Sequence, residues 1–202
     1  MNFFKIISVI FHPLLAPLYF FIVMFFTLGM FSFQLKNIFF LFLFLLFSLV
    51  ILPAFVVRFC KKILIIKEIN LPSKKDGAII LGILLIFYLF NLRMWYLKNP
   101  DIIYLYVFAI FAMNAALLLI FNFIYPLNWH TTTWGSLFGF YLIMLKAGAD
   151  FSFPIIALII LISGFVAVSQ IKIVQTKQPP LYWGFGLGFV AAYLLGITLL
   201  VY

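Results

Sequence analysis

Long apolar runs separated by short polar segments make up most of the chain. A membrane-spanning helix needs about 20 mostly apolar residues, and the pattern predicts seven such helices. They cover residues 8–32, 37–59, 78–96, 101–125, 134–147, 153–171 and 181–202. Continuous apolar runs of this length favour helices over the alternating pattern of a membrane β-barrel. The predicted fold class is therefore all-α: one domain, residues 1–202, forming a polytopic transmembrane helical bundle of six to seven spans.

Three segments depart from a simple span. Pro13 and Pro17 are expected to bend the start of the first helix. Residues 134–147 are short, and they form either a half-helix continued by residues 126–133 or a tilted span in a thin region. Residues 60–77 are the long polar stretch, and their interleaved apolar and charged residues suit a segment lying in the membrane interface. A solvated loop fits residues 60–77 equally well.

The composition supports a membrane protein. The chain is 68% hydrophobic and 8% charged, whereas a soluble domain is about 45–50% apolar and about 25% charged. This excludes a soluble enzyme, a disordered protein and a nucleic-acid-binding module, so no nucleic-acid partner is expected. A single cysteine, Cys60, excludes an internal disulfide and fits no metal motif. No cofactor and no metal are expected.

The Lys and Arg residues, which give the chain a net charge of +9, predict how the protein is oriented in the membrane. With seven spans, the amino terminus and residues 60–77, 126–133 and 171–180 share one face. That face carries nine of the 13 Lys and Arg residues, and the other face carries four. Cytoplasmic loops are enriched in Lys and Arg, so the first face is predicted to be cytoplasmic.

A few polar residues lie within the apolar runs, where each is costly. Asn91, Asn114 and Asn122 are expected to form hydrogen bonds between helices. Arg93 lies near a helix end and is expected to reach the interface. His12, which precedes a proline, is expected to cap a helix or to lie at the interface.

His130 has two interpretations. Pro126 ends the fourth helix, and three threonines at 131–133 open the next, so free amide donors there could bind an anion. His130 could then act as a general acid toward a phosphate ester oxygen. The alternative is an interfacial loop in which Trp129 and Trp134 are headgroup anchors, and these residues alone favour that alternative.

Small residues recur at Gly184, Gly188, Ala192 and Gly196. This spacing is typical of a face where two helices pack closely. No strand precedes these glycines, so they do not form a nucleotide-binding fingerprint.

The order of these features resembles the type 2 phosphatidic acid phosphatase superfamily. The features are a His at a helix start, a Ser-polar pair about 40 residues later, and Gly-x-x-x-Gly in the last helix. Within that superfamily the chain resembles most a branch of small bacterial membrane proteins. Its opening, residues 11–19, also resembles that branch. The resemblance implies a phosphatidic-acid-phosphatase-like core in the bacterial cytoplasmic (inner) membrane, with membrane lipids as partners.

The family has three motifs: Lys-x6-Arg-Pro, Pro-Ser-Gly-His, and Ser-Arg-x5-His-x3-Asp. In such enzymes the last His is the nucleophile, the Asp orients it, and the His of the second motif protonates the leaving group. The Lys and both Arg residues hold the phosphate, because cations offset the charge of the transferred group. The resemblance thus implies a phosphatase site built from the residues at these three motifs.

This chain keeps only part of those motifs. The second motif falls on residues 127–130 and keeps His130. The third keeps Ser169 but has Gln170 at the Arg position, Thr176 at the nucleophile position and Pro180 at the Asp position. No first motif is present, although Lys74 and Lys75 lie where the branch has basic residues. Gln cannot replace the charge or the two-pronged hydrogen bonding of Arg.

We therefore expect a catalytically inactive phosphatase-like protein that binds a lipid or a protein partner in the membrane, or serves as a subunit of an envelope complex. The alternative is an active lipid phosphate or polyprenyl pyrophosphate phosphatase of divergent mechanism. A transporter is disfavoured because Asp101 and Asp150 lie at span ends. The candidate catalytic residue is His130, and the candidate lipid-phosphate ligands are Thr131, Lys74, Lys75, Ser169, Gln170, Lys172, Thr176 and Lys177.

Overall fold

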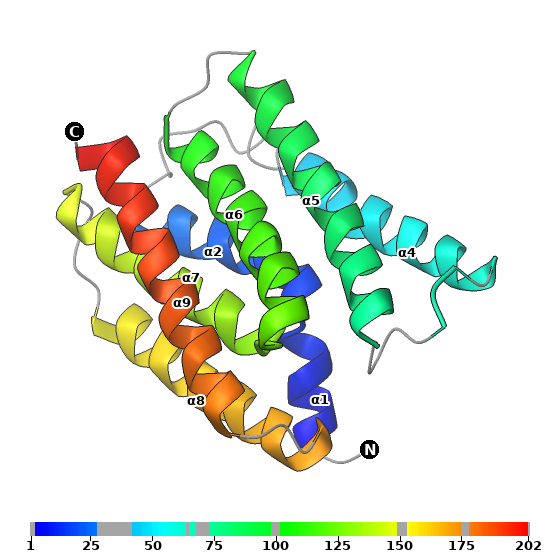
Figure 1. Ribbon diagram of the computed structural model, residues 1–202. Helices are drawn as coiled ribbons and strands as arrows, with labels where there is room; N and C mark the ends of the chain where they lie inside the picture. Colours follow the sequence, from blue (N-terminus) through cyan, green and yellow to red (C-terminus); the bar gives the residue numbers. More distant parts are fainter. Residues whose placement is uncertain are drawn as a thin grey trace.

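The computed structural model is a bundle of helices (Figure 1). It describes residues 3–27, 42–63, 65–67, 73–97, 102–148, 153–174 and 178–201, and within these ranges it has no strand. The α-helices are α1 (Phe3–Ile10), α2 (Ala16–Thr27), α4 (Leu52–Lys62), α5 (Lys74–Tyr96), α6 (Ile102–Ile124), α7 (Trp129–Lys146), α8 (Phe153–Val174) and α9 (Gln178–Gly196). A short 3₁₀ helix, η1 (Pro13–Leu15), and two π-helical segments, η3 (Leu46–Ile51) and η4 (Ile197–Val201), complete the set. The predicted all-α fold class is confirmed.

Six of the helical stretches are long and apolar enough to cross a membrane. They are Phe3–Met24, Phe42–Lys62, Lys74–Tyr96, Ile102–Ile124, Phe153–Ile173 and Gln178–Leu199. The chain is thus a multi-pass membrane protein. The seventh long helix, α7, has 18 residues and rises about 27 Å. It is not among the six, because its first half carries a histidine, three threonines and a serine.

The helices alternate in direction. The start of α5 bonds near the end of α6, where Asn122 Nδ2 donates to the Lys74 carbonyl. The starts of α7 and α9 lie together, since Asn128 N donates to the Pro180 carbonyl. The start of α1 and the helix ends that flank the α4–α5, α6–α7 and α8–α9 connections therefore lie at one end of the bundle, as predicted (Figure 1). The two chain termini lie at opposite ends (Figure 1).

Several helices extend beyond their predicted limits. α4 continues to Lys62, and α5 begins at Lys74, where the Ser73 hydroxyl accepts a hydrogen bond from the amide of Asp76. Lysine stems can lie along apolar surface with the charge in water, so Lys residues continue these helices. The predicted polar stretch 60–77 is correspondingly shorter. Residues 64 and 68–72 lie outside the described residues, so interface segment and solvated loop both remain open.

The first span begins at Phe3 rather than at residue 8, and it is bent as predicted. α1 ends at Ile10, and η1 begins at Pro13. His12 caps η1, because its Nδ1 accepts a hydrogen bond of 3.2 Å from the amide of Leu14. The predicted capping role of His12 is confirmed. The break redirects the chain from α1 into α2 (Figure 1).

The central element is α7, which packs along its length against α9. A Cβ added at Gly135 would overlap the backbone carbonyl of Phe185, and one added at Gly188 would overlap the carbonyl of Thr132. Backbones this close require glycine on both helices. The packing face predicted from the small residues of the last helix is confirmed, and it fixes the position of the first turn of α7.

Candidate functional site

A cavity of about 710 Å³ opens among α1, α5, α6 and α7, with contributions from α4 and α8. We call it the histidine cavity. It is lined by Lys5, Ser8, Val9, His12, Pro13, Leu14, Ala16, Val57, Ile80, Leu81, Leu84, Tyr88, Phe111, Asn114, Ala115, Leu118, Asn122, Pro126, Leu127, Asn128, Trp129, His130, Thr133, Gln170, Ile173 and Pro180. Its volume is in the range of small-ligand sites.

The histidine cavity has a polar end and an apolar wall. The polar end lies where α1, α7 and α8 meet and holds Ser8, Asn128 and Gln170. The apolar wall follows α5 and α6 inward. Along α6 the lining runs from Asn122 to Phe111, a distance of about 16 Å at 1.5 Å per residue. Two asparagines, Asn114 and Asn122, interrupt this mostly apolar wall, and both are hydrogen-bonded to neighbouring helices. A ligand that fills this space would be polar at one end and apolar over the rest.

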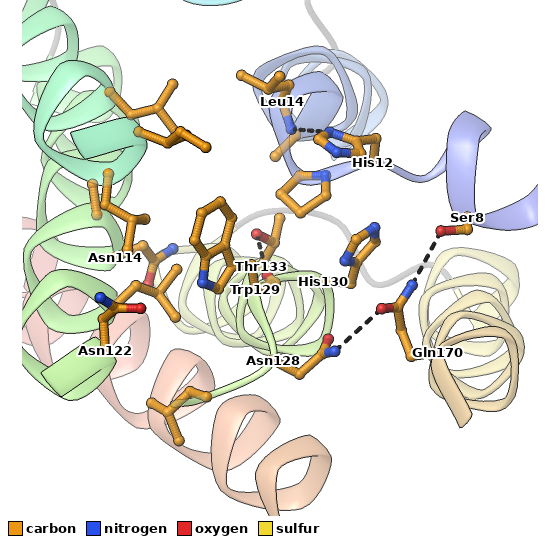
Figure 2. Close-up of a pocket in the computed structure, with 18 of the residues that line it drawn as sticks. Ser8, His12, Leu14, Asn114, Asn122, Asn128, Trp129, His130, Thr133 and Gln170 are labelled. Atoms are coloured by element: carbon orange, nitrogen blue, oxygen red, sulfur yellow. Dashed lines mark hydrogen bonds between the residues drawn. The ribbon is translucent and has the colours of Figure 1, made fainter. Parts of the chain in front are cut away.

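The two histidines of the chain meet in this cavity, although 118 positions separate them in the sequence. The His12 and His130 ring centroids lie 5.3 Å apart, with the rings nearly perpendicular. His130 Nε2 is buried and has no hydrogen-bond partner among the described residues. The His130 ring also lies beside the backbone of Ser8. Figure 2 shows the two rings on the same side of the cavity as Gln170.

His130 is held by the start of α7. The Asn128 side chain caps this helix by accepting a hydrogen bond of 3.1 Å from the amide of Thr131. The helix therefore starts at Trp129, within the predicted 126–133 segment. Of the two alternatives for the short helix, the structure agrees with continuation into the 126–133 segment for residues 129–133, whereas residues 126–128 precede the helix. His130 therefore lies in the first turn.

Gln170 joins three helices at the polar end. Its Nε2 donates to Ser8 Oγ of α1 at 3.1 Å, and its Oε1 accepts from Asn128 Nδ2 at 3.3 Å (Figure 2). Gln170 is buried. Both ends of its amide are occupied by protein groups, so Gln170 is a wall residue that ties α1 and α8 to the cap of α7.

The asparagines in the spans differ in role. Asn114 Oδ1 accepts from the Ser136 hydroxyl, linking α6 to α7, and Asn122 links α6 to α5. For these two, the predicted interhelical hydrogen bond is confirmed. For Asn91 the structure shows a bond within its own helix, from its Nδ2 to the Phe87 carbonyl, and no interhelical bond among the described residues. Asn114 and Asn122 lie across the cavity from the histidines (Figure 2).

Most of the other candidate ligands do not line the cavity. Thr131 is buried against Gly184 of α9, and its hydroxyl donates to the Asn128 carbonyl. The Ser169 hydroxyl donates to the Val166 carbonyl within α8. Lys74 Nζ donates to the Phe123 carbonyl at the end of α6. These three residues are engaged in helix ends or helix packing.

Two further lysines, Lys75 and Lys172, are exposed and also lie outside the lining. Thr176 and Lys177 lie outside the described residues. Of the nine candidate site residues, the structure thus brings His130 and Gln170 together at the cavity.

Sequence reasoning missed His12, Ser8 and Lys5 as cavity residues. The scarcity of histidine was the available signal, because a pair in an apolar chain invites the question of whether its members meet. Among the described residues, no group of three or more His, Cys, Asp or Glu side chains could hold a metal ion.

Comparison of the chain with protein-family models, with curated proteins and with solved structures finds no match. The resemblance to the phosphatidic acid phosphatases therefore stays a prediction.

Proposed function

We propose that the chain binds one amphipathic membrane lipid in the histidine cavity and does not hydrolyse it. It would act as a phosphatase-like protein of the bacterial cytoplasmic membrane, with the polar end of the cavity facing the cytoplasm. The observation that carries the proposal is the joining of a hydrogen-bonding end to an apolar wall of about 16 Å. Lipids match this division of polar and apolar surface.

The engagement of Gln170 supports binding without hydrolysis. A phosphoryl transfer site needs cations on the transferred group. At the position where the resemblance expects a phosphate-binding Arg, this chain has a neutral amide whose two ends bond Ser8 and Asn128. Gln170 therefore stabilises the cavity wall and is not free to hold a phosphate.

Lipid occupancy tests the proposal directly. Native mass spectrometry of the purified protein, supplied with a phospholipid or with a long-chain alcohol, is expected to show one bound lipid. Leu84 lines the cavity, so Leu84→Trp would fill space beside the apolar wall. Leu89 lies on the same helix outside the lining, with 47% of its surface exposed, so Leu89→Trp is the control. We expect Leu84→Trp to weaken binding at least about tenfold, or about 1.4 kcal/mol, and Leu89→Trp to bind as the wild type does. Equal binding by both variants would exclude the cavity as the site.

Phosphate release tests the second half of the proposal. The folded protein in detergent is expected to release no phosphate above background from phosphatidic acid or undecaprenyl pyrophosphate. Release that disappears in His130→Ala would instead show an active phosphatase of divergent mechanism. This variant is the informative control because His130 Nε2 is buried and has no hydrogen-bond partner among the described residues.

A further inference from the structure

His12 and His130 limit which chemical groups the head of the bound lipid can carry. We infer that His12 and His130 together recognise a hydroxyl group, so that the ligand is a single-chain lipid with a hydroxyl head. This inference rests on the proposed lipid-binding function.

The hydrogen bond to Leu14 fixes which ring nitrogen of His12 carries the proton. His12 Nδ1 accepts the hydrogen bond from the amide of Leu14, so Nδ1 carries a lone pair. A neutral imidazole holds its single proton on the other nitrogen. His12 Nε2 is therefore a hydrogen-bond donor, and the cap of η1 fixes it in that form.

His130 Nε2 needs a hydrogen-bond partner that the protein does not provide among the described residues. A buried polar nitrogen without a partner costs about 1–3 kcal/mol, and nearly all such atoms in folded proteins are paired. His130 Nε2 has no partner among the described residues, and its ring lies 5.3 Å from that of His12. A ligand atom within hydrogen-bond reach of both Nε2 atoms would meet both requirements.

A hydroxyl is the simplest group that does so. Its oxygen accepts a hydrogen bond from His12 Nε2–H, and, with the His130 proton on Nδ1, its own O–H donates to His130 Nε2. An ether oxygen can only accept, so it leaves His130 unpaired. A phosphate monoester brings negative charge to the histidine pair, where the donor is a neutral imidazole. Lys5 also lines the cavity but is exposed, and burying a charge away from a cation is costly.

The size of the cavity limits the rest of the ligand. At about 30 Å³ for a water-sized group, a volume of about 710 Å³ holds roughly two dozen such groups. This suits one hydrocarbon chain with a small head. Long-chain alcohols and monoacylglycerols share this chemistry.

The test compares hexadecanol, monopalmitoylglycerol, hexadecyl methyl ether and hexadecyl phosphate by native mass spectrometry at equal concentration. We expect the wild type to prefer hexadecanol over its methyl ether by about tenfold, the usual value of one hydrogen bond. The relative occupancy of hexadecanol and monopalmitoylglycerol identifies which hydroxyl source is favoured.

Two variants remove the nitrogens separately. His130→Phe keeps a ring of similar size, and His12→Asn keeps an acceptor for the Leu14 amide while removing the Nε2 donor. His130→Phe is expected to bring the alcohol-to-ether ratio close to one. His12→Asn removes the hydrogen bond that alcohol and ether both accept, so it is expected to weaken the binding of both ligands and to leave their ratio near the wild-type value. Thr198→Ala, which removes a hydroxyl bonded within its own turn near the carboxyl terminus, should leave the ratio unchanged. Thermal unfolding of each variant establishes that it is folded.

The outcomes separate the two proposals. Equal binding of alcohol and ether by the wild type, or tighter binding of hexadecyl phosphate, would overturn the hydroxyl inference and leave lipid binding standing. An unchanged alcohol-to-ether preference in folded His130→Phe would also overturn it. If the wild type bound none of these lipids and no phospholipid, the proposed function itself would fail.

Discussion

At the residue scale, the hydrogen bonds of Gln170 fix the shape of the polar end of the histidine cavity. Gln170 lies at the meeting point of α1, α7 and α8, and it bonds the first helix to the cap of the seventh. In an apolar interior these bonds specify geometry, because an amide that loses one partner has few replacements nearby. The polar end of the cavity depends on this residue for its shape.

Gln170→Leu keeps much of the side-chain volume and removes both hydrogen bonds. We expect it to lower the free energy of unfolding by about 1–3 kcal/mol, because the partners Ser8 and Asn128 lose hydrogen bonds in a partly buried site. A detergent-denaturation titration measures this change. Gln178→Leu is the matched control, since Gln178 is exposed, and its unfolding should match the wild type. Equal stabilities for the two variants would contradict the bridging role.

At the scale of elements, the pair α7 and α9 is the rigid part of the bundle. The two helices run in the same direction, since Gly135 lies against Phe185 and Gly139 against Phe189. Without a hydrophobic driving force between helices in lipid, close backbone approach and van der Waals packing hold such pairs together. The glycines on both sides permit that approach.

Two glycines of α9 provide a test within one helix. A Cβ at Gly188 would overlap the Thr132 carbonyl, whereas a Cβ at Gly186 would meet nothing within 4 Å. We expect Gly188→Ala to destabilise the protein by about 1–3 kcal/mol or more, as overpacking does. Gly186→Ala should be neutral or stabilising by up to about 1 kcal/mol. Thermal unfolding in detergent compares them, and equal melting temperatures would refute the close packing.

Sequence reasoning was most successful where a feature is local in the chain. Apolar run length indicated the spans, and the spacing of Gly184 and Gly188 indicated a packing face, because both follow from helical periodicity. It could not place Thr131 or Ser169, since both belong to helices whose rotation about their axes is set by tertiary packing. It could not join His12 to His130, because only the folded bundle brings them together.

At the scale of the whole molecule, most of the Lys and Arg residues in the part of the chain that the structure describes lie at one end of the bundle. Lys75 and Lys172 are exposed there, and Leu97 is exposed at the other end of α5. From the positive-inside pattern we expect the first end to face the cytoplasm. The polar end of the histidine cavity lies at the same end as these lysines.

Cysteine labelling tests this orientation in a Cys60→Ser background. An impermeant maleimide added to intact cells is expected to label Leu97→Cys and to leave Lys75→Cys and Lys172→Cys unlabelled until the membrane is opened. Labelling of Lys75→Cys and Lys172→Cys from opposite sides would contradict the bundle topology. Labelling of both from outside would reverse the orientation and keep the topology.

The polarity of α7 has a consequence for biogenesis. This helix is synthesised before α9, whose glycines fit against it, and polar residues weaken the insertion of an isolated helix into lipid. A nascent chain that ends before residue 178 therefore holds α7 without its principal neighbour. We expect α7 to enter the bilayer stably only after α9 has been made, so that the centre of the bundle is the last part of the protein to be assembled.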